Sequence, residues 1–252
     1  MSQRWLGLAL IGALLLAWEL AVASGAITAL SFPRVSAIAA AWVELTLGDD
    51  LVVELLDTLR RMLIGFSVAA LIGIPLGLLT GTSRLVHALF EPLIELVRPI
   101  PSPAYIPIAI LLLGIGDSMK VAVVSVAALF PILLNTYQGV RDIDPILTNT
   151  GRTFGLGRMT ILREVALPAA LPSILTGMRI SLGIAFILAV IAEMVIGNDG
   201  MGHLILASQR AFRIPEMYAG IFTLAVLGYS INWLFVRIEN VLLRGRPRSG
   251  VV

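Results

Sequence analysis

Cysteine is absent from this sequence of 252 residues, and histidine occurs only at His87 and His203. The absence of cysteine excludes disulfides, thiol nucleophiles and thiolate metal sites, and two histidines give no basis for a histidine-rich metal site. Lysine is almost absent too, because seventeen of the eighteen basic residues are arginine. The single lysine, Lys120, follows Met119 rather than glycine, so the chain carries no phosphate-binding P-loop.

Charged residues are also scarce: they make up 13% of the chain, whereas 58% is hydrophobic and the mean hydropathy is positive. Several apolar runs are long enough to cross a bilayer. The period-two alternation of a transmembrane barrel is not found, so the spans are expected to be helices. The sequence predicts an all-α integral membrane protein with about six transmembrane helices, at Trp5–Ala23, Met62–Thr82, Leu85–Gly114 (broken in the middle), Met119–Val140, Ser173–Gly197 and Met217–Ile238.

The first segment has a second interpretation as a cleavable signal peptide. Arg4, the apolar stretch and the Ala21-Val22-Ala23 triplet fit such a leader. Trp5 and Trp18 instead suit the two membrane interfaces of a retained helix, and removal of the segment would leave an odd number of spans. A retained span is the expectation.

The distribution of arginine predicts the orientation in the membrane. With the N-terminus in the cytoplasm, that side receives Arg4, Arg84, Arg141, Arg152, Arg158, Arg163, Arg244, Arg246 and Arg248. The opposite side receives mostly acidic residues, with Arg34, Arg60, Arg61, Lys120, Arg210 and Arg213 as exceptions. The positive-inside rule therefore places both termini in the cytoplasm and makes residues 141–172 a cytoplasmic loop.

This loop has helical patterning. In Met159–Leu167, apolar residues recur at helical spacing and the charges occupy another face, which predicts a short amphipathic helix. We expect Gly155, Gly157, Pro168 and Pro172 to interrupt the helix and to stiffen its exit into the fifth span. The alternative is a helix that lies on lipid headgroups.

The same loop resembles a known family motif. Gly155, nine further residues and Val165-Ala166-Leu167-Pro168 resemble the "EAA" loop of ATP-binding-cassette (ABC) importer permeases. The family pattern has Glu-Ala-Ala where this chain has Asn149-Thr150-Gly151, so a salt bridge through that glutamate is not expected here.

Further stretches resemble the nitrate, sulfonate and taurine branch of these permeases, in the expected order along the chain. They are Thr58-Leu59-Arg60-Arg61 with Gly65-Phe66, Leu96 to Pro101, Leu113 to Gly116, Leu167 to Pro172, and Ala192-Glu193-Met194 with Gly200-Met201-Gly202. The resemblance implies a MetI-like type I importer permease fold, as one permease domain over residues 1–252 with its core at roughly 55–240.

The resemblance also implies the function and the partners. It implies a non-catalytic bacterial inner-membrane subunit that moves a small polar solute inward, with taurine or another alkanesulfonate first and nitrate or a similar anion next. It further implies a second permease copy, an external solute-binding protein and two ATPase subunits that carry ATP and Mg²⁺, with no cofactor, metal or nucleic acid on this chain. The residues that it places at the ATPase contact are Arg152, Thr153, Phe154, Gly155, Leu156, Gly157, Ile161, Leu162, Val165, Leu167 and Pro168.

A stripe of small residues runs along the second span. Gly65, Ala69, Gly73, Gly77 and Gly81 recur every four residues, which indicates close packing against another helix, with a substrate lining as the alternative. Pro75 in the same span predicts a kink.

The third span cannot be one continuous helix, because it contains Arg98-Pro99-Ile100-Pro101-Ser102-Pro103. Irregular backbone at membrane depth is tolerated beside protein or a water-filled cavity, so this break is a candidate part of the translocation pathway. An interfacial turn between two short helices is the alternative.

Four carboxylates lie in or near the spans, at Glu19, Glu91, Glu95 and Glu193. Each needs a partner or a role there. Glu193 is expected near the outer end of the fifth span, where it pairs with an arginine such as Arg210 or lines the gate. An ion-coupled secondary transporter that uses Glu19 and Glu193 is the alternative function, and no catalytic Ser/His pair, metal motif or aspartate pair indicates an enzyme.

Overall fold

The computed structural model describes residues 2–27, 29, 31–48 and 50–243, and the regular secondary structure in these ranges is helical throughout. The helices are α1 (Ser2–Ala23), α2 (Val35–Leu47), α3 (Asp50–Thr82), α4 (Arg84–Val97), a 3₁₀ turn (Ser102–Ala104), α5 (Tyr105–Leu113), α6 (Asp117–Arg141), α7 (Pro145–Thr153), α8 (Arg158–Ile161), a π-helical turn (Leu162–Ala166), α9 (Leu167–Ile196), α10 (Met201–Arg210) and α11 (Ile214–Leu242).

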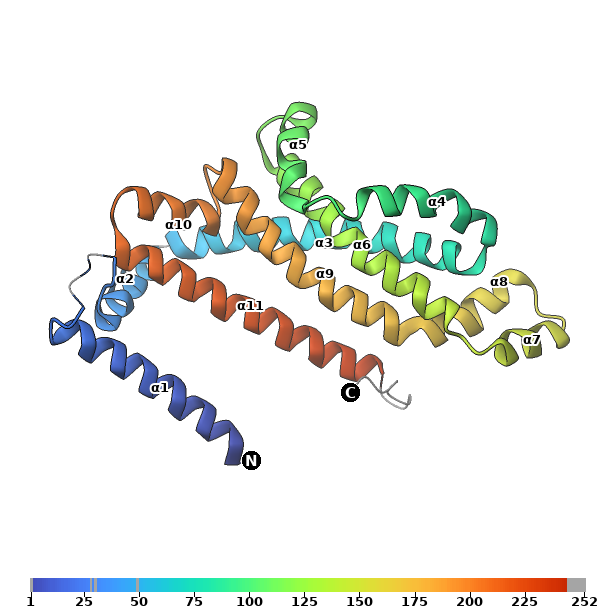
Figure 1. Ribbon diagram of the computed structural model, residues 1–252, viewed down its shortest axis with the longest axis horizontal. Coiled ribbons are helices and arrows are strands. Elements are labelled where there is room, and N and C mark those ends of the chain that lie inside the picture. Colours follow the sequence, from blue (N-terminus) through green and yellow to red (C-terminus); the bar gives the residue numbers. More distant parts are fainter. Residues whose placement is uncertain (1, 28, 30, 49, 244–252) are drawn as a thin grey trace.

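The long helices α3, α6, α9 and α11 run along the long axis of the molecule (Figure 1). One end of this bundle carries α7 and α8, and the opposite end carries α2 and α10; we call them the α7 end and the α10 end. Helix α1 stands apart from the bundle for most of its length (Figure 1). Its C-terminal part is joined to the start of α2 and the residues before it, because Trp18 Nε1 donates to the Pro33 carbonyl at 3.1 Å and Glu19 accepts two hydrogen bonds from Ser36.

Five described helices are long and apolar enough to cross a membrane, and the α4–α5 pair makes a sixth candidate span that is bent by 88°. This confirms the all-α class and the number of about six spans. The third span is broken as predicted, since α4 ends at Val97 and the next helical turn begins at Ser102. Helices α2 and α10 were not predicted, because segments of 13 and 10 residues give no span-length signal.

Helices α3 and α6 pack through the small-residue stripe of α3. A Cβ atom on Gly65 would lie 2.6 Å from Val124 Cγ1, and one on Gly77 would lie 2.5 Å from Thr136 Cβ. Ala69 in the same stripe is buried. Gly73 and Gly81 likewise face Ile132 and Val140 of α6. The absence of side chains on this face therefore sets how closely the two backbones approach.

The third helix of the core, α9, covers α6 on its other side. Gly177 of α9 lies against Asn135 and the Pro131 carbonyl, and Gly139 of α6 lies against Ser173. The main hydrophobic core accordingly lies between α3, α6 and α9, with Met62, Met119, Ile132 and Leu188 among its buried members.

The loop at residues 141–172 differs from its predicted form. A separate helix, α7, precedes the glycines, capped by Asp144, whose Oδ1 accepts from the Ile146 N–H at 2.8 Å. Pro168 and Pro172 do not interrupt the helix, which continues from α8 through the π turn into α9. The helix widens from α to π at Leu162–Ala166, so the missing N–H of Pro168 falls just after this wider turn, where the regular α bonding pattern is already changed.

For some of the arginines that were predicted on the cytoplasmic side, the structure gives no side-chain position. Arg244, Arg246 and Arg248 lie outside the described residues, as do the side chains of Arg4 and Arg158.

Candidate functional site

Helices α7 and α8 form a hairpin (residues 145–161) whose turn is fixed by backbone hydrogen bonds. The Gly155 N–H donates to the Arg152 carbonyl at 2.9 Å, and the Leu156 N–H donates to the Gly151 carbonyl at 3.1 Å. These two bonds form a Schellman motif, in which the left-handed residue is Gly155 at φ +73°. The glycine of the loop pattern is therefore needed for the sharp end of α7.

The two arms of the hairpin contact each other at another small residue. A Cβ atom on Gly151 would lie 3.4 Å from Ile161 Cγ1 and 3.6 Å from Leu156 Cδ1. Gly151 is buried, and it occupies the last position of the altered Asn149-Thr150-Gly151 triplet. A small residue here lets the two arms of the hairpin contact each other, although the triplet has lost its acidic residue.

Several large apolar side chains are exposed on the hairpin, beside polar residues such as Asn149 and Arg152. Phe154 is 78% exposed, and Ile146, Leu147 and Met159 are also exposed. An apolar groove of about 570 Å³ lies between α7 and the start of α9, bordered by Leu147, Phe154, Val165, Pro168 and Pro172, among others. Exposed apolar patches of this kind mark contact surfaces.

Most of the predicted coupling residues border one of two cavities. Phe154, Val165 and Pro168 border the apolar groove, and Arg152, Ile161 and Leu162 border a larger cavity of about 920 Å³ between the hairpin and the α3–α4 connection. Leu156 borders both. Ile161 is directed toward Gly151 rather than outward, and it is half-buried. Thr153, Gly155, Gly157 and Leu167 are exposed, and Thr153 donates its hydroxyl to the Asn149 carbonyl. Sequence reasoning missed Ile146, Leu147 and Met159 as surface residues.

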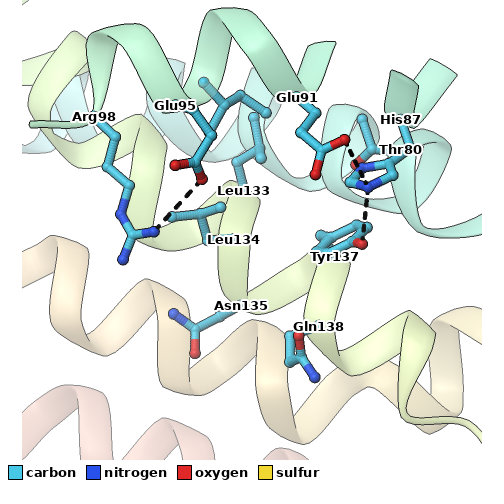
Figure 2. Close-up of a pocket in the computed structure, with 11 residues that line it drawn as sticks. Thr80, His87, Glu91, Glu95, Arg98, Leu133, Leu134, Asn135, Tyr137 and Gln138 are labelled. Atoms are coloured by element: carbon cyan, nitrogen blue, oxygen red, sulfur yellow. Dashed lines mark hydrogen bonds and ion pairs between the residues drawn. The ribbon is translucent and has the colours of Figure 1, made fainter. Parts of the chain in front are cut away.

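A polar cavity of about 380 Å³ lies between α4 and α6 (Figure 2). His87 stacks on Tyr137 with ring centroids 4.8 Å apart, and its Nε2 lies 3.3 Å from the Tyr137 hydroxyl and 3.5 Å from Glu91. Further along α4, Glu95 pairs with Arg98 at 3.9 Å. His87, Glu91 and Glu95 of α4 and the following Arg98 are spaced four, four and three apart, so they share one face. The opposite face carries the exposed side chains of Leu85, Leu89, Leu93 and Leu96.

The break at residues 98–103 contributes only its first residue to this cavity. Arg98 lines the wall, whereas Pro99, Pro101, Ser102 and Pro103 form the bend and do not border the cavity. The bend is held by Tyr105, whose hydroxyl donates to the Val97 carbonyl at 3.0 Å. His87 and Tyr137 are cavity residues that sequence reasoning missed, although the spacing of His87, Glu91 and Glu95 was a signal.

Glu193 lies far from this cavity, in a buried ionic network at the α10 end. Its Oε1 accepts from Arg61 Nη1 at 3.0 Å, and the two side chains are 0% and 1% exposed. Arg61 also pairs with Asp117 and Asp199, each at 2.7 Å. The expected arginine partner of Glu193 was Arg210, and this was wrong: Arg210 ends α10 with an exposed side chain, whereas Arg61 points into the packed core.

The network also holds the N-terminus of α10. The Gly202 N–H donates to Glu193 Oε2 at 3.1 Å, and the Met201 N–H donates to Thr58 Oγ1 at 2.9 Å. At the N-terminus of α10 these carboxylate and hydroxyl oxygens accept hydrogen bonds from the free N–H groups, and the negative charge of Glu193 interacts favourably with the helix dipole. A Cβ atom on Gly200 would lie 2.2 Å from Glu193 Cδ, so the two glycines around Met201 provide the space for this contact.

Asp199 joins the network from the loop between α9 and α10. Its Oδ1 accepts from Lys120 Nζ at 2.6 Å, and its Oδ2 lies 2.7 Å from Arg61 Nη2. Burial by itself raises the pKa of Asp199, but the hydrogen bonds from Lys120 and Arg61 outweigh it and hold the pKa below its usual value. Asp199 is therefore ionised at neutral pH and balances the two basic side chains.

Comparison with known proteins identifies the architecture. The model of the family described as "Binding-protein-dependent transport system inner membrane component" matches residues 73–244. The chain belongs to this family. It is thus an ABC importer permease of the MetI-like type, and in this family the ATPase is a separate chain.

Relatives match along most of the chain. A Brucella abortus protein named as an ABC transporter permease is 34% identical over 92% of both chains. A Bacillus subtilis protein named as an aliphatic sulfonates transport permease, SsuC, is 32% identical over 95% of this chain and 87% of its own. The nitrate import permease NrtB of a Synechocystis species is 30% identical over 76% of this chain and 70% of its own.

A solved structure shares the fold. An inward-facing form of the MetNI methionine ABC transporter has a chain that matches with a TM-score of 0.68 at 22% identity, over 78% of this chain and 98% of that one. This similarity confirms the MetI-like fold that the loop residues indicated.

Proposed function

We propose that this importer permease moves a small polar anion into the cytoplasm and that its α7–α8 hairpin binds the separate ATPase. An alkanesulfonate such as taurine is the first candidate solute, and nitrate or a similar anion is the second. The relatives named for aliphatic sulfonates and for nitrate support this class of solute.

The observation that carries the proposal is the form of the hairpin. Its turn is locked by backbone hydrogen bonds, it presents exposed Phe154 beside an apolar groove, and it continues without interruption into α9. A force applied to α8 therefore reaches the core through one continuous helix. A partner that fills the groove can move the spans without touching them, as alternating access requires.

The proposed assembly follows from the size of the chain. A bundle of about six spans is too narrow to enclose a pathway, so two copies related by a twofold axis are expected, with one ATPase beneath each copy. ATP and Mg²⁺ are bound by those ATPases, and an external solute-binding protein delivers the solute. In this arrangement residues 1–252 form one permease domain in the bacterial plasma membrane, with residues 141–172 and both termini in the cytoplasm.

Replacing Phe154 with alanine tests the docking role. We expect the affinity for the ATPase to fall roughly thirtyfold, as for the loss of an aromatic anchor worth about 2 kcal/mol. The measurement is copurification of the tagged permease with its ATPase from membranes, followed by titration of the detergent-solubilised complex.

Asn149→Ala is the matched control, since Asn149 is an exposed polar residue on the same helix. It should retain the ATPase. If Phe154→Ala holds the ATPase as tightly as the unmodified chain does, the hairpin is not the docking element and the proposal fails.

A further inference from the structure

Arg179 is a basic residue deep inside an apolar span. It lies twelve residues after Leu167 and seventeen before Ile196 in α9, which corresponds to roughly 18 Å and 26 Å along the helix axis. The fifth span expected from the sequence is Ser173–Gly197, so Arg179 lies six residues, or roughly 9 Å, inside its cytoplasmic end and within the hydrocarbon core. It is also exposed at the surface of the chain.

The bonding of Arg179 differs from that of the other deep basic residues. Arg61 pairs with Glu193, and Lys120 pairs with Asp199. Arg179 has no ion-pair partner in the part of the chain that the structure describes, and its Nε donates to Asn232 Oδ1 of α11 at 3.2 Å. The Asn232 contact fixes the side chain but leaves its charge unbalanced.

A small cavity of about 60 Å³ adjoins the Arg179–Asn232 contact, between α9 and α11. Gly183 and Gly228 border it, and a Cβ atom on Gly183 would meet no other atom within 4 Å. The volume equals that of about two liquid waters. Space for a small polar group is therefore present beside the guanidinium.

An unpaired arginine among acyl chains costs about 2.5 kcal/mol or more at the bilayer centre, which favours water or protein over lipid on this face of α9. Thr176, one turn before Arg179, is also exposed on it. With Nε held by Asn232, the terminal N–H groups remain available, and their planar fork suits a small oxoanion.

We propose that Arg179, positioned by Asn232, binds the oxoanion group of the solute within the membrane. The ligand class is a small solute whose singly charged oxoanion group has a planar or trigonal oxygen face, such as a sulfonate or nitrate. This inference rests on the proposed anion-import function and names the residue that would contact the anion.

Binding of ³⁵S-labelled methanesulfonate to the purified permease–ATPase complex, without any solute-binding protein, tests the inference. We expect saturable binding that unlabelled nitrate competes away. Arg179→Gln should weaken it about tenfold or more, as for the loss of a charged hydrogen bond, and Arg179→Lys should recover part of the affinity because it keeps the charge.

Arg237→Gln is the matched control, because Arg237 lies over the Trp233 ring of its own helix, 4.6 Å from the centroid. It should bind methanesulfonate as the unmodified complex does. The inference is overturned if the unmodified complex shows no saturable binding, or if Arg179→Gln leaves the affinity unchanged. It is also overturned if Arg179→Gln separates the two permease copies, since that would identify a carboxylate of the second copy as the partner.

These outcomes are distinct from failure of the proposed function. If Arg179→Gln retains the ATPase and Phe154→Ala loses it, the docking proposal stands whether or not the anion binds at Arg179.

Discussion

A valine at position 77 is expected to prevent the folded permease from accumulating. A Cβ atom there would lie 2.5 Å from Thr136 Cβ and 2.7 Å from the Leu133 carbonyl oxygen of α6. The backbone oxygen cannot rotate away, so α3 and α6 would have to separate along their whole contact. We expect Gly77→Val to cost more than about 3 kcal/mol, at the upper end of what overpacking a core costs. Size-exclusion chromatography of the detergent-solubilised protein gives the folded fraction.

Gly12→Val is the control for this substitution. Gly12 also lies inside a span-length helix, α1, but a Cβ atom on it would meet no other atom within 4 Å. The same change in side-chain size should therefore leave the yield of folded protein unchanged. Normal yields from Gly77→Val would show that the stripe does not set the α3–α6 distance.

Replacing Arg61 with methionine is expected to be the second most damaging change. Its guanidinium is 1% exposed and faces the carboxylates of Glu193, Asp117 and Asp199. Removing it leaves Glu193 buried without its counter-charge, and the loss of one partner from a buried pair costs about 3–5 kcal/mol. The midpoint of thermal unfolding in detergent, followed by tryptophan fluorescence, should fall strongly.

The adjacent arginine is the control, because Arg60 is 55% exposed and pairs with Asp57 and Asp117. Arg60→Met should cost less than about 1 kcal/mol, as exposed ion pairs do. Adding Glu193→Met to Arg61→Met should recover part of the lost stability, since the uncompensated charge is then removed. Equal losses from Arg60→Met and Arg61→Met would contradict a buried network.

The features that the sequence predicted well are those with a local signal. Apolar length located the spans, and the prolines after Arg98 located the break in the third span. The four-residue recurrence from Gly65 to Gly81 marked the face of α3 that lies on α6.

The partners of buried charges had no local signal. Arg61 and Glu193 are 132 residues apart in sequence, and only the packing of α3 against α9 brings them together. Arg61 was predicted to lie in a loop because α3 was expected to begin near Met62, whereas α3 begins at Asp50 and buries Arg61 about three turns into the helix. Arg179 could have been noticed, since an arginine within an apolar span is itself a signal.

The loop shows why proline positions misled the prediction. Proline was taken as the end of a helix, yet Pro168 falls in the first turn of α9, just after the π turn that already changes the regular α bonding pattern. The prediction that Gly155 interrupts the helix is confirmed, because Gly155 has a positive φ, a backbone conformation that disfavours other residues.

Accessibility of residue 150 tests the central claim most directly, and because the chain has no native cysteine an introduced thiol is the only one. Thr150→Cys places it at an exposed position that borders the apolar groove and keeps the Phe154 anchor. A membrane-impermeant maleimide should label it in inside-out vesicles stripped of the ATPase but not in intact spheroplasts, and addition of the ATPase should protect it. Labelling from the outside of spheroplasts, or labelling that the bound ATPase leaves unchanged, would contradict the role of the α7–α8 hairpin.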